Sequence, residues 1–528
     1  MQQFSFDFGD PSYTVNGWRL GLQVITFENT YGLDPDQTLS RDGSIVSAGL
    51  RWAGGQERCA GRVLIATEGG PERLRVDISA RHEKKIRCTK LILSGLPDGT
   101  LLGARWERNP IPDGGVILGW PRGGIPMPLI CLQDPEAGDW LYFRSLDDRV
   151  REKRFAVYRT DAGVTVELIH EDAGHEMINE TQAPTWEIGR CADPTEIVAE
   201  QQAHVERAFG LQPWETRPDV PAWAREISFV AAIHMMHWSG YMLNTYDRAL
   251  EVLAWVCGHI DGRRVLAFLP GWEGRYYWQY GHYRPHPRLG GPEAFRRLVD
   301  GAHDLGVHVC PMFGCNCANE GLESFEQWGA GSHLVSAGGY VLQGNKPDWD
   351  VSRAHDPGWQ AWLNPGAPGW GNRLFEESVR VIEDFGVDAT FYDTNASWTN
   401  DPNHAVFEGM VRLRDRLKAR FPELLVTGEH WYSPLGSIFP VSHSWAPEEF
   451  NEVVFARYNR RWQHLNTGDP SRGSTGVHEL GTNPWSAPPL RRDMWPTVTF
   501  VDGTIANAAD RVEQAIEVGR RYAEEFLE

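Results

Sequence analysis

The 528-residue sequence has no long hydrophobic run and no excess of positive charge. No stretch of roughly 18 or more apolar residues occurs, so no segment is long enough to cross a bilayer as a helix, and we expect no membrane partner. The 51 Lys and Arg residues are outnumbered by 71 Asp and Glu residues, which gives a formal charge of −20. Because such an acidic surface repels phosphate backbones, we also expect no nucleic acid partner.

The amino-terminal segment, Met1 to Asp10, lacks the basic stretch followed by an apolar stretch that a secretory signal requires. We therefore expect a cytoplasmic protein. The sequence does not determine the oligomeric state, and a homo-oligomer is compatible with it.

Cysteine is scarce, with eight residues in the whole chain. Such thin scatter is typical of reduced, buried thiols rather than of a disulfide framework. Cys310, Cys315 and Cys317 lie close to His308, but their spacing matches no common zinc pattern, so we expect no metal site. No glycine-rich segment has the strand, turn and helix context of a phosphate-binding loop, and we expect no cofactor.

The amino-terminal part of the chain alternates apolar and polar residues in short segments, such as 18–24, 73–78 and 164–169. Turn-forming clusters of Gly, Pro and Asp separate these segments. Alternation with a period of two and regular turns is typical of antiparallel sheets packed face to face. We predict a β-sandwich over residues 1–192, followed by a helix and linker over 193–222 that starts at the capping residue Asp193.

After Trp223, apolar strands alternate with amphipathic helices, which indicates βαβ units and a parallel sheet. The length suits a (β/α)8 TIM barrel over residues 223–528, so the chain is predicted to be multidomain. Two further strands are expected between Trp431 and Gly481, without defined bounds. The strands with predicted bounds cover residues 227–233, 265–269, 307–313, 387–392, 424–427 and 496–501, and the helices cover 246–256, 292–305, 373–385, 405–420 and 506–526.

Two carboxylates follow consecutive predicted barrel strands, where the active residues of such barrels lie. Asp393 ends one strand and Glu429 ends the next. Strands lie about 4.8 Å apart, so the carboxyl groups could face each other at the roughly 5 to 5.5 Å of a retaining glycosidase. A single acid at a strand end is more often a helix cap or a loop hydrogen-bonder, but the pair, with aromatic neighbours, favours catalysis.

The roles of the two acids follow from their expected surroundings. Glu429 stands beside Trp431, and desolvation by an aromatic ring favours the protonated form that a general acid needs. Asp393 stands near Asn395 and suits the nucleophile, which must be ionised. The reverse assignment stays open on the sequence alone.

Aromatic and polar residues that follow the other strands could line a sugar-binding site, because flat rings stack on pyranose faces while His and carboxylate groups bind hydroxyls. Each aromatic residue could equally fill space within a loop without touching a sugar, and His234 could be a buried core residue. For a third acid that helps to hold the sugar we consider Glu273, Glu479 and Asp502, and we prefer Glu479, which His478 precedes. The predicted substrate-binding residues are Trp272, Glu273, Tyr277, Trp278, His282, His234, Asn395, Trp398, His430, Trp431, His478 and Glu479.

The run from Pro270 to Tyr283 and the following 287–291 segment resemble barrel glycosidases related to endo-α-N-acetylgalactosaminidases. In that comparison the strand ending at Asp393 is similar to the nucleophile strand, and the strand ending in Glu429 is similar to an acid/base strand shared more distantly with α-amylase-like enzymes. The resemblance implies a retaining mechanism on α-linked sugars and a mutarotase-like sandwich ahead of the barrel. Phe391 stands where the α-amylase pattern has Arg, so α-amylase specificity does not carry over.

We therefore predict a retaining glycoside hydrolase that cleaves an α-glycosidic bond in a small glycoside or oligosaccharide, with carbohydrate as its partner. Two alternatives stay open. One is a metal-dependent sugar isomerase or epimerase in which Asp393 and Glu429 bind a divalent ion. The other is a carbohydrate-binding protein without catalysis.

Overall fold

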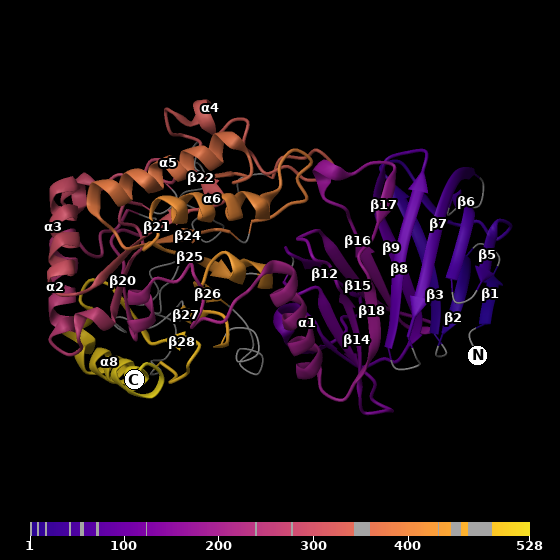
Figure 1. Cartoon of the computed structure of the whole chain (residues 1–528), viewed down its shortest axis with the longest axis horizontal. Helices are drawn as coiled ribbons and strands as arrows, with labels where there is room; N and C mark the ends of the chain where they lie inside the picture. Colours follow the sequence, from indigo (N-terminus) through magenta and orange to yellow (C-terminus); the bar gives the residue numbers. More distant parts are fainter. Residues whose placement is uncertain are drawn as a thin grey trace.

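The chain folds into an antiparallel, sheet-rich amino-terminal part and a parallel barrel, joined by one helix (Figure 1). No helix among the described residues is long and apolar enough to span a membrane. The computed structural model describes residues 3–7, 10–15, 18–41, 44–52, 57–69, 73–122, 124–237, 240–275, 278–342, 360–395, 397–430, 432–444, 456–462 and 488–528.

The amino-terminal strands pair only in the antiparallel sense and form two layers, here called sheets I and II. Strand β4 (Thr30–Leu33) links them, because it pairs with β3 of one sheet and β6 of the other. Sheet I consists, in order, of β1 (Gln3–Asp7), β2 (Asp10–Val15), β3 (Trp18–Thr26), β9 (Ile86–Leu96), β16 (Gly163–His170), β15 (Lys153–Thr160) and β12 (Val116–Trp120).

Sheet II is longer, and the short strand β17 (Glu180–Gln182) pairs with its β8 alongside β18. Phe155 of sheet I packs edge-on against Trp186 of sheet II, with ring centroids 5.7 Å apart, so the two sheets share one apolar core. This arrangement confirms the predicted sandwich. Sheet II consists, in order, of β5 (Thr38–Arg41), β6 (Ser44–Trp52), β7 (Arg58–Glu68), β8 (Arg73–His82), β18 (Trp186–Cys191), β14 (Trp140–Ser145), β13 (Leu129–Gln133), β10 (Thr100–Leu102) and β11 (Arg108–Pro110).

Helix α1 (Pro194–Phe209) follows the sandwich where the sequence predicts it. Asp193 caps its first turn by accepting a hydrogen bond from the Thr195 amide at 2.9 Å, and Gly210 ends it in the left-handed conformation at φ 65°. The apolar side of α1, with Ile197 and Val198, packs against sheet II. The helix thus covers the sandwich and leads into the barrel.

The barrel strands all pair in parallel, which confirms the predicted barrel. Their side chains are buried on both faces because helices cover the outside, so the strands read as continuous apolar runs. Strands β28 and β29 are separated only by Pro496; β28 pairs with β27 and β29 pairs with β19, so together they close the ring. The strands are β19 (Phe229–Ile233), β20 (Val265–Leu269), β21 (His308–Gly314), β24 (Ala389–Asp393), β25 (Leu425–His430), β26 (Val441–Ser444), β27 (Arg460–Trp462), β28 (Met494–Trp495) and β29 (Thr497–Phe500).

All six strands with predicted bounds are present to within three residues, and β26 and β27 are the two expected between Trp431 and Gly481. A minor two-stranded sheet, β22 (Cys317–Ala318) with β23 (Ala361–Trp362), and the short α4 (Phe325–Trp328) lie beside the barrel. The predicted outer helices also form: they are α2 (Tyr246–Cys257), α3 (Gly291–Asp304), α5 (Pro368–Phe385), α6 (Val406–Arg420) and α8 (Thr504–Phe526).

Large rings fill the barrel interior. Phe268 of β20, Phe391 of β24 and Trp462 of β27 meet with centroid distances of 5.0 to 5.5 Å, although none of these strands is paired with another of the three. The interior is therefore a packed core, and a ligand can enter only at an end. Because alternate residues of a strand share a face, the interior position of Phe391 also directs Asp393 inward.

An ion pair at the amino-terminal end of the barrel gives a pH-dependent contribution to stability. His303 Nε2 lies 2.9 Å from Asp388 Oδ2, and this hydrogen bond raises the pKa of His303. Burial alone would raise the pKa of Asp388, but hydrogen bonds from His303 and His308 outweigh burial and lower the pKa to about 2. The pair therefore stabilises the fold while His303 is protonated and Asp388 is ionised.

Replacement His303→Gln should lower the urea midpoint at pH 5 to 6 and have less effect as the pH rises through the pKa of His303, because the protonated imidazole is lost there in the wild type too. The loss should stay below about 1 kcal/mol, since His303 is partly exposed and screened by solvent. His333→Gln, at a histidine that contacts only a backbone carbonyl among its described hydrogen bonds, is the control. A pH-independent loss in His303→Gln contradicts the prediction.

Candidate active site

The two predicted catalytic acids lie side by side at the carboxyl end of the barrel. In the β24–β25 pair, Tyr392 is opposite Gly428, so the next residues, Asp393 and Glu429, stand at the same level on adjacent parallel strands. Both side chains are buried, with 3% and 6% of their surface exposed. Residues at one level of a parallel pair share a face, so both carboxyl groups point inward, on strands about 4.8 Å apart.

The Asp393 carboxylate has one hydrogen-bond donor that the sequence does not reveal. The Tyr280 hydroxyl donates to Asp393 Oδ2 at 3.0 Å from the loop after β20. Burial raises the pKa of Asp393, and the hydrogen bond from Tyr280 partly offsets that rise. The resulting pKa is about 6. Asp393 is therefore mostly ionised at neutral pH and protonated in mild acid.

The residue after Asp393 has a strained backbone. Thr394 adopts φ 65°, which is rare for a β-branched residue. Its hydroxyl compensates by donating to the Asp393 carbonyl at 2.6 Å and accepting from the Asn316 amide at 3.2 Å. The Cys315 amide also donates to the Asp393 carbonyl, at 2.7 Å. Strained residues of this kind persist only where their neighbours hold them in place, and they cluster at functional sites.

Asn395 joins the ends of β24 and β25. Its side-chain amide donates to the Glu429 carbonyl at 3.0 Å and accepts from the Glu429 amide at 3.1 Å. Gly428 is needed for this approach, because a Cβ there would lie 2.7 Å from the side-chain amide group of Asn395. The Asn395 amide, expected to contact the substrate beside Asp393, here holds the Glu429 backbone, and its contact with the substrate stays a prediction.

His430 turns away from the interior. Its Nε2 lies 2.6 Å from the Phe439 carbonyl, and burial lowers the pKa of His430 to about 3, so the ring is neutral. This contact ties the end of β25 to the segment after the short helix η7 (Ser433–Ser437). The expected contact of His430 with the substrate stays a prediction.

Glu273 is a buried acid beside Asp393 without a hydrogen-bond partner for either carboxyl oxygen among the described residues. Only 1% of its surface is exposed. Burial raises the pKa of Glu273 well above its usual value, and the negative charge of Asp393 raises it further. A buried polar group left unpaired is costly, so this side chain is ready to bind a ligand group that can hydrogen-bond to it.

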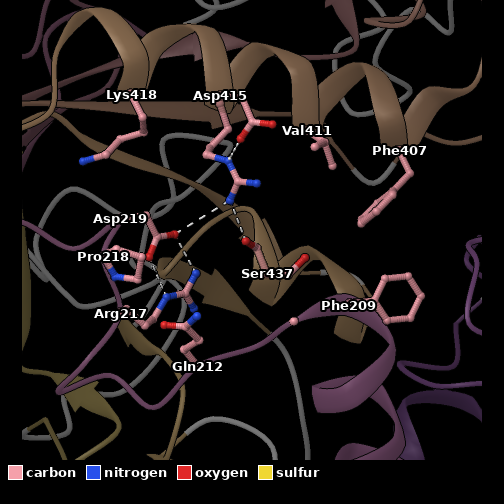
Figure 2. A pocket seen from close by; sticks show the side chains of 12 residues that line it. Phe209, Gln212, Arg217, Pro218, Asp219, Phe407, Val411, Asp415, Lys418 and Ser437 are labelled. Carbon is pink, nitrogen blue, oxygen red and sulfur yellow. Dashed lines mark hydrogen bonds and ion pairs between the residues drawn. The ribbon is translucent and has the colours of Figure 1, made fainter.

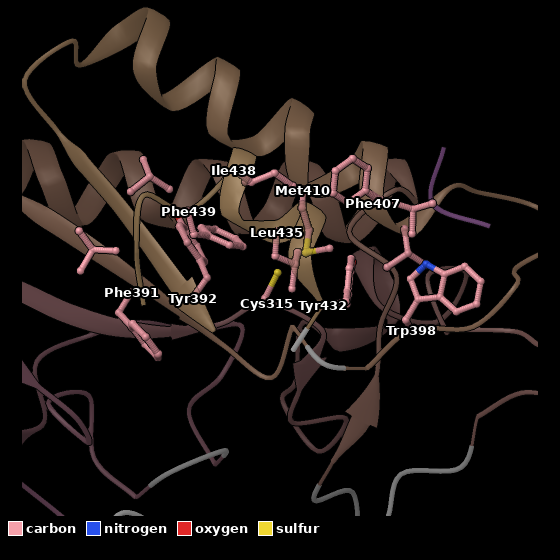
Figure 3. Close-up of a cluster of buried hydrophobic side chains, with 14 of the residues drawn as sticks. Cys315, Phe391, Tyr392, Trp398, Phe407, Met410, Tyr432, Leu435, Ile438 and Phe439 are labelled. Atoms are coloured by element: carbon pink, nitrogen blue, oxygen red, sulfur yellow. The ribbon is translucent and has the colours of Figure 1, made fainter. Parts of the chain in front are cut away.

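The predicted aromatic residues differ in where the structure places them. Trp272 is fully buried, donates to the Met312 carbonyl at 2.9 Å and stacks on Phe295 of α3, so it packs between barrel and helix rather than at the mouth. Trp398 belongs to the cluster of buried apolar side chains that also contains Phe407 and Tyr432 (Figure 3). Trp278 is only partly buried, and the Arg275 guanidinium lies 4.1 Å from its ring centroid.

Two further predicted histidines, His234 and His282, follow different barrel strands, β19 and β20. His234 is buried directly after β19, and its carbonyl accepts from Asn244 Nδ2 at 2.7 Å. Burial lowers the pKa of His282, and the charges that act on it most are those of Arg284, Glu377, Arg373 and Arg380. The other predicted residues, Tyr277, Trp431, His478 and Glu479, lie outside the described residues.

The cysteines near the site are free thiols. Cys315 and Cys317 are fully buried, and burial raises the pKa of both thiols, with a further rise from the charges of Asp393 and Glu429. Within the described ranges, no group of three His, Cys, Asp or Glu side chains is arranged to hold a metal ion.

A cavity of about 440 Å³ lies behind η7 rather than at the carboxylates (Figure 2). Its charged groups pair among themselves: Arg217 binds Asp219 through two hydrogen bonds and donates to the Gly436 carbonyl at 2.7 Å. Arg414 of α6 donates to the Ser437 carbonyl at 2.8 Å. These two arginines therefore hold the end of η7, the helix that follows Glu429.

No protein-family model matches the sequence, and no curated protein sequence matches it. Solved structures do share its fold. The α-N-acetylgalactosaminidase NagBb from Bifidobacterium bifidum, in complex with GalNAc, has a TM-score of 0.67 at 15% identity, covering 99% of this chain and 92% of NagBb. The GH36 α-galactosidase AgaA from Geobacillus stearothermophilus has a TM-score of 0.54 at 12% identity, covering 96% and 75%.

The α-galactosidase from Lactobacillus brevis is similar over 100% of this chain and 72% of its own, with a TM-score of 0.52 at 12% identity. These likenesses concern the fold, and they extend over the sandwich as well as the barrel.

Replacement Glu273→Gln should make the protein more stable than the wild type at pH 7 to 8 and equally stable near pH 4.5. The folded chain keeps a proton on Glu273 that the unfolded chain releases above its ordinary pKa, so wild-type stability falls as the pH rises, whereas Gln is neutral throughout. Urea unfolding from pH 4.5 to 8 measures the difference.

Glu377→Gln is the matched control with the opposite sign. Glu377 is also a buried glutamate, but hydrogen bonds from Arg284 and Arg380 outweigh burial and lower its pKa. Its replacement should therefore destabilise the protein at neutral pH. A loss of stability in Glu273→Gln at pH 8 contradicts the account of Glu273.

Proposed function

We propose that this protein is a retaining glycoside hydrolase that cleaves an α-glycosidic bond, with Asp393 as nucleophile and Glu429 as acid/base. One observation carries the proposal: two buried acids stand at the same level on adjacent parallel strands, both facing the carboxyl end of a barrel. Adjacent strands place carboxyl groups close to the roughly 5 to 5.5 Å that a double displacement needs.

The surroundings of the two acids support these roles. Asp393, ionised with the help of Tyr280, attacks the anomeric carbon while Glu429 gives a proton to the leaving oxygen. Water then attacks the glycosyl ester, and Glu429 takes the proton of that water. Asn395 fixes the Glu429 backbone relative to the nucleophile strand, which keeps the two acids at a constant separation through both steps.

For the substrate we propose a small α-linked glycoside of a galactose-type sugar. The structures of similar fold are an α-N-acetylgalactosaminidase and α-galactosidases, which supports this choice. Glu273 is buried next to Asp393 and its carboxyl oxygens have no hydrogen-bond partner among the described residues, so it is suited to hydrogen-bond a ring substituent of such a sugar. The cytoplasmic location and a homo-oligomer remain predictions from the sequence.

Azide rescue tests the two roles with 4-nitrophenyl α-N-acetylgalactosaminide and 4-nitrophenyl α-galactoside. Replacement Glu429→Ala should lower hydrolysis by about 10² to 10⁴-fold. Azide should restore nitrophenol release and give the α-glycosyl azide, because it attacks the ester on Asp393 without needing a base. Asp393→Gly with azide should give the β-glycosyl azide, because azide then displaces nitrophenolate directly.

Asp388→Asn, at the opposite end of strand β24, is the control and should keep activity within about threefold. The proposal fails if Asp393→Gly and Glu429→Ala both retain wild-type activity, or if the two azide products have the opposite configurations. An isomerase would convert sugar without releasing nitrophenol, and a binding protein would show saturable binding without turnover.

Replacement Tyr280→Phe should move the acid limb of the pH profile of kcat/KM to higher pH. In the wild type, activity should fall as the pH drops through about 6, where Asp393 becomes protonated. Loss of the Tyr280 hydroxyl removes a hydrogen bond to the ionised form, so the pKa of Asp393 rises.

Tyr283→Phe is the matched control, because Tyr283 is a buried tyrosine of the same loop whose hydroxyl accepts from the Gly314 amide at 2.8 Å instead of contacting Asp393. Its acid limb should match that of the wild type. Equal shifts in the two variants, or none in either, would show that Tyr280 does not set the ionisation of Asp393.

A further inference from the structure

One end of sheet I contains a buried ionic network. Lys153 Nζ lies 2.6 Å from Asp147 Oδ2, and neither side chain has exposed surface. Arg151 bridges Asp147 and Asp172 at 2.8 and 3.2 Å, and His170 Nε2 lies 3.0 Å from Asp172. Burying such charges is expensive and adds stability only when the geometry is good, so a network of this kind is better suited to fixing a conformation than to raising stability.

This network lies where three strands of sheet I meet the barrel. Lys153, the first residue of β15, pairs with Trp120 at the end of β12 and with His170 at the end of β16. Its ammonium group also lies 5.8 Å from the centroid of the Trp120 ring. The ends of β12 and β16 are therefore held in one arrangement, and both of these ends contact the barrel.

The first contact anchors the loop that follows Asp393. Asn400 Oδ1 accepts from the Gly174 amide at 2.7 Å, and Asn400 Nδ2 donates to the Asp172 carbonyl at 2.8 Å. Gly174 permits this approach, because a Cβ there would lie 2.7 Å from the backbone oxygens of Asn400 and Asp401. The far end of the loop that begins at Asp393 is thus held by the sandwich.

The second contact anchors the loop that follows Glu429. Tyr432 packs edge-on against Trp120, with ring centroids 6.1 Å apart, and the Ser433 amide donates to the Pro126 carbonyl at 2.8 Å. On its other side, η7 is held by Arg217 and Arg414 across the cavity in Figure 2. Only a few residues separate Glu429 from these anchors.

We propose that the amino-terminal sandwich is a positioning element of the active site: through Gly174 and Trp120 it fixes the loops that follow Asp393 and Glu429, and so sets the placement of both acids. No sandwich residue in these contacts needs to touch the substrate. The inference rests on the proposed function, and it assigns a catalytic consequence to a part of the chain that lies outside the barrel.

Two sandwich variants test the two anchors separately, using substrates with a good and a poor leaving group. Gly174→Ala should displace the nucleophile loop and lower kcat about tenfold for both substrates, with KM little changed, since small misplacements of reacting groups are costly. Trp120→Phe shortens the ring that meets Tyr432 and should lower kcat mainly for the poor leaving group, which depends on protonation by Glu429.

Gly114→Ala is the matched control, because a Cβ at this sandwich glycine meets no atom within 4 Å. Activity is expressed per folded molecule, from circular dichroism and gel filtration, so that a loss of folded protein does not count as a loss of kcat. A purely structural role of Trp120 would leave the leaving-group dependence of Trp120→Phe unchanged, and a purely structural role of Gly174 would leave kcat per folded molecule of Gly174→Ala unchanged.

The inference is overturned if Gly174→Ala and Trp120→Phe match Gly114→Ala in kcat and in leaving-group dependence while the wild type turns over. If the wild type itself shows no turnover on any α-glycoside, the proposed function fails and the inference fails with it. These two results differ in the wild-type measurement, so they cannot be confused.

Discussion

The parallel pairing of β24 with β25 is the constraint on which the site depends. Because Tyr392 stands opposite Gly428, the acids that follow them share one level and one face, and their separation follows from strand spacing rather than from flexible loops. Asn395 locks this arrangement by bonding to both backbone groups of Glu429. The rings of Phe268, Phe391 and Trp462 close the barrel beneath, so the acids can be reached only from the carboxyl end.

Burial raises the pKa of Asp393 and of Glu273, and burying both acids costs stability. Hydrogen bonds from Tyr280 and from the Thr394 amide favour the ionised form of Asp393, whereas the carboxyl oxygens of Glu273 have no hydrogen-bond partner among the described residues and burial raises the pKa of Glu273 well above its usual value. Two neighbouring carboxyl groups with such different environments differ in pKa, which is the arrangement that separate acid and base roles require. The strained backbone of Thr394 and the anchors on the sandwich belong to the same pattern, in which the surrounding structure holds a site that would otherwise relax.

Much of the fold follows from the sequence because it rests on local patterns. The alternation of apolar and polar residues with a period of two predicts the sandwich. Apolar runs between amphipathic helices predict the barrel strands, including the strand ends that carry Asp393 and Glu429. The roles of other residues depend on the direction in which their side chains point, and a sequence pattern does not specify that direction. Trp272 follows a barrel strand, as a sugar-stacking residue would, yet its ring turns outward against Phe295.

Contacts between residues far apart in the sequence could not be predicted from it either. Asn395 is close in sequence to Asp393 but bonds to Glu429 on the next strand, and Tyr280 reaches Asp393 from a loop more than a hundred residues earlier. The hydrogen bond from the Gly174 amide to Asn400 joins the two halves of the chain. The local sequence gives no sign of this bond beyond the presence of a glycine. Such contacts arise only once the sandwich and barrel are packed together.

The most direct test of the central claim is to trap the glycosyl–enzyme. Incubation of the wild type with a 5-fluoro-α-glycosyl fluoride of a galactose-type sugar, followed by peptide mass mapping, identifies the residue that attacks the anomeric carbon. The account predicts one adduct, on the peptide that contains Asp393. An adduct on Glu429 or on any other residue, or turnover of the reagent through an enzyme that never becomes covalently modified, would contradict it.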